Sequence, residues 1–171
     1  EDADLEDLMG SVPSGYQRQP IKGFVEVDRS GEFVRFFPTS GGSNARDRGK
    51  QFVVPHVMRS SAIRPKLLVD NAEYVLGVDK SASADNPKVA KRPLAFIDAI
   101  RDCFEATDNQ DVGAVLQYLT RSPASPPPLW DGFDPTLNYS FVVAGKRPFE
   151  DPDVRQYWAS KVIGTGTDEG K

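Results

Sequence analysis

The stretch that decides the fold is FVEVDRSGEFVRFF, which occupies residues 24–37. Its two halves, residues 24–28 and residues 33–37, are rich in Phe and Val, and the four residues between them include Gly31. Apolar, β-branched and aromatic runs joined by a short glycine-containing connection are typical of a β-hairpin. The sequence therefore predicts two antiparallel strands as the start of a small sheet.

The segments on either side of this hairpin have weaker patterns. Residues 1–20 begin with an acidic stretch and contain several turn-forming residues, so we expect a loop that leads into the hairpin. Residues 39–49 are rich in Gly, Ser, Asn and Arg and predict a mobile basic loop, and residues 52–54 (FVV) predict a short strand. Residues 56–78 follow neither a helical nor an alternating period, so their local structure stays open.

Two amphipathic helices are expected in the second half of the chain. The first begins at Pro93, because proline is favoured in the first turn and apolar residues then recur at spacings of three, three and four. Its apolar positions are Leu94, Ile97, Ile100 and Phe104. The second is capped by Asn109 and ends near Arg121. Its inner face consists of Val112, Val115, Leu116 and Leu119.

The carboxy-terminal third adds one strand and one helix. Residues 123–128 (PASPPP) predict an extended connector, because successive prolines supply no amide donors. Residues 139–143 predict a strand that Gly145 closes, and Asp151 and Pro152 predict the start of a helix. That helix would carry Val154, Tyr157, Trp158 and Val162. Residues 164–171 are expected to be disordered.

Together these elements predict an α+β fold, in which a hairpin and a small sheet pack with about three amphipathic helices. The chain has 171 residues, 39% of them hydrophobic and 27% charged, which suits one soluble domain over residues 1–163. The net charge of −4 is unevenly distributed. Residues 46–101 hold eleven Lys or Arg and six Asp or Glu, so the middle of the chain is basic and could meet nucleic acid.

Catalytic chemistry has few candidates in this sequence. His56 is the only histidine and Cys103 the only cysteine, and we interpret both, with Trp130 and Trp158, as structural residues. The carboxylates of Asp102 with Glu105, and those in residues 150–153, suit a polar helix face and a helix start better than a metal site. We therefore expect no metal, no cofactor and no enzymatic activity, and the single thiol fits a reducing cytoplasm.

The best functional candidate is residues 59–66 (RSSAIRPK), followed closely by Asp70 and Asn71. Arg and Lys neutralise phosphates, Ser hydroxyls donate to phosphate oxygens, and an Asn amide can contact a base edge. Asp70 would orient a neighbouring amide or Arg, or accept from a cytosine amino group. The alternative for Asn71 is a cap or a turn, which asparagine often forms. The candidate contacts are Arg59, Ser60, Ser61, Arg64, Lys66, Asn71, Lys80, Lys88, Lys91 and Arg92.

Longer blocks of the sequence carry a family resemblance. Residues 59–77, RSSAIRPKLLVDNAEYVLG, closely resemble the signature of the large subunit of the type I-C CRISPR surveillance complex, called Cascade. Residues 93–104 and residues 149–158 (FEDPDVRQYW) resemble two further blocks of that family, in the same order. Residues 19–23 depart from the family's lead into the hairpin, and Phe149 stands where a His is common. We expect the chain to be an amino-terminal fragment of such a subunit.

This resemblance implies a non-catalytic role. The large subunit lies near the 5′ end of the guide RNA, contacts the backbone subunits and recognises the short motif, the PAM, that flanks a double-stranded DNA target. It helps to load that DNA, while guide pairing reads the remaining sequence. A separately recruited helicase-nuclease would cut the DNA. No membrane is involved.

Two other functions remain open. The chain could be a docking scaffold within the same complex, with little direct DNA contact, in which case Trp158 and the proline connector would matter most. It could also be a nuclease, which would need carboxylates or a histidine clustered beside the basic face.

Overall fold

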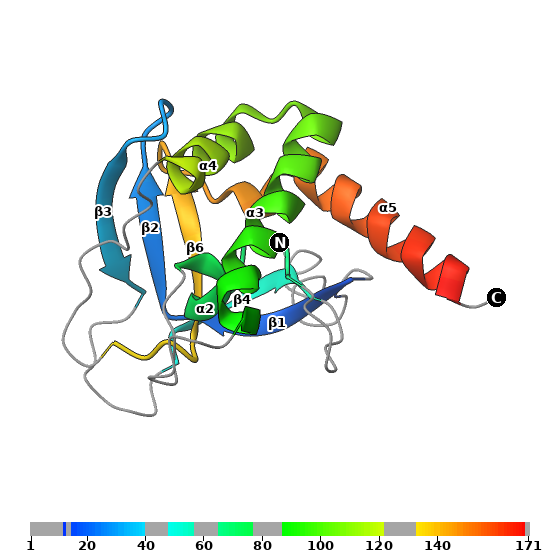
Figure 1. Cartoon of the computed structure of the whole chain (residues 1–171), viewed down its shortest axis with the longest axis horizontal. Coiled ribbons are helices and arrows are strands. Elements are labelled where there is room, and N and C mark those ends of the chain that lie inside the picture. The colour runs from blue at the N-terminus through cyan, green and yellow to red at the C-terminus, as the bar shows by residue number, and fades with distance from the viewer. Residues whose placement is uncertain are drawn as a thin grey trace, which may run out of the picture.

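A computed structural model describes residue 12 and residues 15–39, 48–56, 65–76, 87–121 and 133–169 (Figure 1). For the helical residues 87–90 and 162–169 only the backbone is described. The predicted mobile loop over residues 39–49 lies mostly outside these ranges, as do the proline connector and Trp130. Within the described ranges, no helix combines the length and apolar character that crossing a membrane requires.

The predicted hairpin is confirmed. Strands β2 (Gly23–Val27) and β3 (Phe33–Pro38) pair antiparallel, with a register shift between Glu26 and Val27. One carboxylate oxygen of Asp28 closes the turn by accepting the amides of Ser30 and Glu32 at 2.9 and 3.0 Å. Gly31 has a φ of +84°, a conformation that glycine adopts without steric cost.

The strand expected at residues 139–143 is also confirmed, as β6 (Asn138–Val143). It lies parallel to β2, and its other edge pairs antiparallel with the two-residue strand β5 (Asp70–Asn71). The sheet order is therefore β3-β2-β6-β5, with β6 in the interior of the sheet. Its apolar composition suits this position, because neighbouring strands pair with both of its edges and the residues from Tyr139 to Val143 are all buried.

A second, two-stranded sheet occupies the region expected to be a lead-in loop. Strand β1 (Tyr16–Ile21) pairs antiparallel with β4 (Lys50–Pro55), which is longer than the strand predicted at residues 52–54. The expectation of a loop up to residue 20 was therefore wrong. Pro20 is compatible with β1 because this strand pairs only with β4 and needs no amide donor on its other edge.

The helices follow the predicted order with shifted boundaries. Helix α3 (Pro87–Thr107) begins before Pro93, so the predicted start at Pro93 was wrong and this proline lies within the helix. Proline removes one backbone hydrogen bond, and the many tertiary contacts of α3 outweigh that local loss. Helix α4 (Gln110–Thr120) confirms the second prediction, since the Asn109 side chain accepts the Val112 amide and Arg121 ends the helix.

The remaining helices are α2 (Ala72–Val75), the 3₁₀ helix η1 (Pro148–Glu150) and α5 (Pro152–Glu169). Helix α5 begins at Pro152 as expected but continues past Gly164, where we expected disorder to begin. A glycine inside a helix costs only about 1 kcal/mol, so a helix that is already formed can extend through it. Figure 1 shows α5 pointing away from the sheet toward the carboxy terminus.

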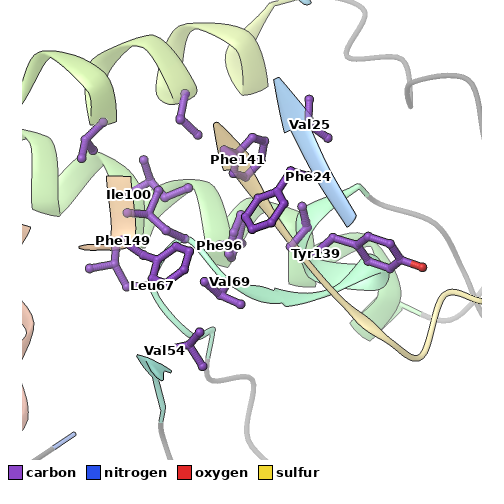
Figure 2. Packing of buried hydrophobic residues seen from close by; sticks show 14 of the residues in the cluster. Phe24, Val25, Val54, Leu67, Val69, Phe96, Ile100, Tyr139, Phe141 and Phe149 are labelled. Atoms are coloured by element: carbon purple, nitrogen blue, oxygen red, sulfur yellow. The ribbon is translucent and has the colours of Figure 1, made fainter. Parts of the chain in front are cut away.

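The core lies between the four-stranded sheet and helices α3 and α4, and the predicted α+β fold is confirmed (Figure 2). Phe96 of α3 stacks on Phe141 of β6, with ring centroids 6.5 Å apart. Phe149 is fully buried beside Phe52. Cys103 is buried as predicted, and Trp158 anchors α5 by donating from Nε1 to the Gly15 carbonyl at 2.7 Å.

Candidate nucleic-acid interface

Residues 65–71, from the run that carries the family resemblance, are held in place by their apolar side chains. Leu67, Leu68 and Val69 are at most 1% exposed, and Figure 2 shows Leu67 and Val69 within the core cluster. Leu68 adopts a φ of +65°, which is unusual for a residue with a β-carbon. Its carbonyl accepts a hydrogen bond of 2.7 Å from the Ser140 hydroxyl of β6. The buried residues 67–69 therefore fix the backbone positions of Lys66 and Asp70 on either side of them.

The Asp70 carboxylate forms hydrogen bonds with nearby backbone amides. Its side chain is buried, and its two carboxylate oxygens accept the amides of Lys66 at 2.9 Å and Asn71 at 2.8 Å. Of the roles considered from the sequence, the structure shows the orientation of a neighbouring amide. The carboxylate closes the turn that carries Lys66 and is screened from any phosphate outside.

Asn71 caps helix α2, as the alternative interpretation of this residue anticipated. Its Oδ1 accepts the amides of Glu73 at 3.1 Å and Tyr74 at 3.4 Å. The Nδ2 group of this half-buried side chain makes no hydrogen bond to the described residues. The acceptor half of the amide is thus committed to the fold, whereas the donor half is available to a ligand.

The amino-terminal end of β6 joins this segment to the β1–β4 ribbon, which we define as residues 16–21 and 50–55. Asn138 lies opposite Asn71 in the sheet, its Nδ2 donates to the Pro20 carbonyl at 3.1 Å, and its carbonyl accepts the Lys22 amide at 2.8 Å. Asn138 therefore places the end of β1 beside the Asn71 cap. The cap and the ribbon form one continuous junction, although they are far apart in the sequence.

Gly49 and Thr39 close the same junction. The Thr39 hydroxyl donates to the Ile21 carbonyl at 2.7 Å and accepts the Lys50 amide at 3.1 Å. Gly49 has a φ of +104°, and a β-carbon there would lie 2.1 Å from the Ile21 carbonyl oxygen. Only glycine fits so close an approach of two backbones. Exposed Arg48 and Lys50, on either side of it, are thereby held at the junction.

Arg92 has a partner within the fold. Its Nη1 donates to both carboxylate oxygens of Glu73, at 2.8 and 2.9 Å, and its guanidinium lies 5.9 Å from the Tyr74 ring centroid. The Glu73 side chain is 2% exposed and that of Arg92 is 26% exposed. This ion pair ties α3 to α2 immediately behind the Asn71 cap, so Arg92 supports the site from the protein side.

A turn at residues 134–137 orients the start of β6. The Asp134 carboxylate accepts the Thr136 hydroxyl at 2.6 Å and the Thr136 amide at 2.9 Å. These hydrogen bonds, the hydroxyl first, lower the pKa of Asp134, and the positive charge of Arg48 adds to the shift. The Tyr139 hydroxyl donates to the Asp134 carbonyl at 2.9 Å, and burial raises the pKa of Tyr139.

The structure brings only some of the predicted contact residues to this junction. Lys66 and Asn71 lie there, Arg92 lies behind it in an ion pair, and Lys91 is exposed on α3. Only the backbone of Lys88 is described. Arg59, Ser60, Ser61, Arg64 and Lys80 lie outside the described residues. Sequence reasoning missed Lys50, Arg48 and Asn138, because the pairing that gathers them is non-local.

Four of the carboxylates considered for metal binding, Asp102, Glu150, Asp151 and Asp153, are engaged in protein contacts. Asn109 Nδ2 donates to Asp151 and Asp153 at 3.0 Å, and Asp102 pairs with Lys161 at 3.9 Å. Among the described residues, no three His, Cys, Asp or Glu side chains group as a metal site would require. Burial raises the pKa of the Cys103 thiol to about 11, so it is protonated at neutral pH.

A family model described as CRISPR-associated protein (Cas_Csd1) matches residues 2–171. No curated protein matches the chain.

Proposed function

Because the chain belongs to the Cas_Csd1 family of CRISPR-associated proteins, we propose that it is part of the large subunit of a type I-C RNA-guided complex and reads the motif flanking a double-stranded DNA target. The role is non-catalytic. Protein contacts select a few base pairs and help to load the duplex, and guide pairing reads the rest of the target. The complex then recruits a helicase-nuclease that cuts the DNA.

The observation that supports DNA reading is the available donor of Asn71. With Oδ1 occupied by two backbone amides, Nδ2 can donate to an acceptor on a base edge, such as guanine O6 or N7 or thymine O4. The paired donor-and-acceptor contact that asparagine makes to adenine would require the cap to open. We therefore infer that Asn71 contacts a guanine or a thymine in the flanking motif.

The remaining contacts of the proposal are electrostatic. Lys66 and the segment containing Arg59, Ser60, Ser61 and Arg64 would bind phosphates, with Lys80, Lys88 and Lys91 continuing the basic surface. The subunit would also meet the 5′ end of the guide RNA and the backbone subunits, in the cytoplasm. Phosphate contacts position the duplex, and Asn71 contributes to the sequence preference.

The test uses the complete complex assembled with its guide RNA and a series of duplexes that differ only in the flanking motif. Asn71→Ser retains a capping oxygen but loses the amide donor. We expect it to lower affinity for the preferred motif by about 1–3 kcal/mol and to relax the preference at one position. Lys66→Ala should weaken all duplexes equally and reduce the salt dependence of binding.

Asn109→Ser is the matched control, because it changes the other asparagine cap of the described chain and lies at the far end of α3. It should leave the motif preference intact. If Asn71→Ser lowered the affinity equally for every flanking motif, Asn71 would not contact a base of the motif. An unchanged affinity for DNA in both Asn71→Ser and Lys66→Ala, in a fully assembled complex, would instead indicate a docking scaffold.

A further inference from the structure

The β1–β4 ribbon combines exposed cations and amides with an absence of acids. Residues 15–22 and residues 48–56 contain the exposed cations Arg18, Arg48 and Lys50 and the buried Lys22 but no Asp or Glu, although the whole chain has a net charge of −4. Elsewhere, five described arginines pair with carboxylates, whereas the exposed Arg29 and Arg155 pair with no described carboxylate. Those pairs are Arg35–Glu26, Arg92–Glu73, Arg101–Asp98, Arg121–Glu32 and Arg147–Glu150. In contrast, Arg18 and Lys50 form no ion pair with any described residue.

The two faces of this ribbon differ. Ile21 and Val54 are buried on one face, where half-buried Phe52 contacts Phe24. Cross-strand partners point to the same side of a sheet, so the pairs Tyr16–Pro55, Arg18–Val53 and Pro20–Gln51 share the opposite face, which is buried at its Tyr16–Pro55 end. Arg18 and Gln51 are exposed on it. Beyond that buried end, the outer face presents a guanidinium and an amide. Lys50, which shares the face of Ile21, and Arg48 lie at the end of the ribbon.

From this arrangement we infer that the outer face of the ribbon enters the major groove of the flanking DNA duplex. The inference rests on the proposed function and adds a second contact surface to it. Arg18 and Gln51 face base edges, and Arg48 and Lys50 bind the bordering phosphates. Asn138 couples this surface to Asn71 through its hydrogen bond to Pro20, so both surfaces meet one duplex.

The shape of the ribbon favours B-form DNA. The major groove of B-DNA is wide enough for a two-stranded β-ribbon, whereas that of an RNA helix is too deep and narrow for side chains to read. Arginine contacts guanine O6 and N7, and glutamine contacts adenine N6 and N7, which are major-groove atoms. The side chains of Arg18 and Gln51 are thus suited to purines in duplex DNA.

The first test measures the phosphate contacts. In the assembled complex, Arg48→Ala with Lys50→Ala should lower the slope of log affinity against log salt by about 2, because each phosphate contact contributes about 0.9. The control is Arg29→Ala with Lys146→Ala. It removes the same charge from two exposed residues that lie near Asp111 and follow the ends of β2 and β6. The control should leave the slope unchanged.

The second test measures the base contacts. Duplexes with 7-deazapurines in the flanking motif lose the major-groove N7 acceptor but keep their base pairing. The wild-type complex should bind them about tenfold or more weakly than natural duplexes. Arg18→Ala with Gln51→Ala should reduce this penalty several-fold. Melting curves of both double variants should match the wild type, since all four substituted side chains are exposed.

The outcomes separate the two proposals. If the wild-type complex shows no preference for any flanking motif, the proposed function fails. If the wild type shows a motif preference, but the ribbon variants keep its salt slope and its deazapurine penalty, the major-groove inference is wrong and the proposed function stands. Loss of guide RNA from the assembled ribbon variants would also overturn the inference, because the ribbon would then contact RNA.

Discussion

Among the described residues, Asn71 and Asn109 each cap a helix, and their amide groups differ in one respect. Asn109 Oδ1 accepts the Val112 amide, and its Nδ2 donates to Asp151 and Asp153. Asn71 Oδ1 similarly accepts two amides, but its Nδ2 has no partner among the described residues. Asn109 uses the whole amide to hold the fold, whereas Asn71 uses half of it.

This difference shows how a capping residue can also recognise a ligand. A cap needs only an acceptor, which Ser, Thr and Asp also provide. The additional donor of asparagine is useful only where something accepts from it. At Asn109 two carboxylates accept it, so the choice of asparagine is explained within the fold. At Asn71 we propose that DNA is the acceptor.

The largest effect is expected from the ion pair behind the Asn71 cap. Arg92→Ala should lower the free energy of unfolding by about 3 kcal/mol, because the buried Glu73 carboxylate loses its guanidinium partner. Urea unfolding of the chain measures this change. Arg101→Ala, which removes an exposed pair with Asp98, should cost less than about 0.5 kcal/mol. If Arg92→Ala lowered the free energy of unfolding no more than Arg101→Ala does, the Arg92–Glu73 pair would not stabilise the region behind the Asn71 cap.

Asn109→Ala should have the next largest effect, about 2 kcal/mol. The variant loses the cap, which contributes about 1 kcal/mol, and the hydrogen bonds to two carboxylates. Asn109→Ser retains the cap and should recover about half of that loss in thermal melts. A full recovery would mean that the bridge to Asp151 and Asp153 contributes nothing, and the two asparagines would then be equivalent.

A smaller effect is expected for Asn71 itself, because only its cap contributes to stability. Asn71→Ala should lower the free energy of unfolding by about 1 kcal/mol, and Asn71→Ser should be close to the wild type. Denaturant titration of both variants gives the comparison with Asn109. If Asn71→Ser also lowered the free energy of unfolding substantially, Nδ2 of Asn71 would have to contribute to folding stability, and the proposed difference from Asn109 would be wrong.

The smallest effect concerns Asp134, which orients the start of β6 beside Asn71. Its folded-state pKa is lowered by the Thr136 hydrogen bonds, so the ionised carboxylate stabilises the fold above the unfolded pKa of about 4. That contribution is lost as the pH falls through the lower folded value. Asp134→Asn should therefore cost about 0.5 kcal/mol at pH 7 and almost nothing near pH 2. If the difference in free energy of unfolding between the wild type and Asp134→Asn did not change with pH, the ionised carboxylate would not be its cause.

Features that local chemistry decides were predictable from the sequence. The hairpin has its glycine turn, α4 has its asparagine cap and apolar spacing, and β6 has its apolar run. Features that depend on distant partners were not. Pro20 suggested a loop because its tolerance in β1 depends on an edge that only the tertiary structure defines. Likewise, the internal Pro93 of α3 suggested a helix start.

The candidate site was predictable in part, for the same reason. The family-like run drew attention to Lys66 and Asn71, and both lie at the junction with β6. Arg92 looked equivalent to the other cations because its pairing with Glu73 spans two helices. The ribbon cations Arg18 and Lys50 stand alone in the sequence, and only the register of β1 with β4 places them on one structure.

The parallel pairing of β2 with β6 also affects how the chain folds as the ribosome releases it. The β2–β3 hairpin emerges early, but Gly23 must wait for Tyr139 before its other edge is covered. During translation β2 therefore exposes an unpaired edge beside Phe24 and Val25, the kind of surface that promotes aggregation. Nascent chains stalled before residue 138 should accordingly depend on chaperones, and release from that dependence should coincide with the emergence of β6.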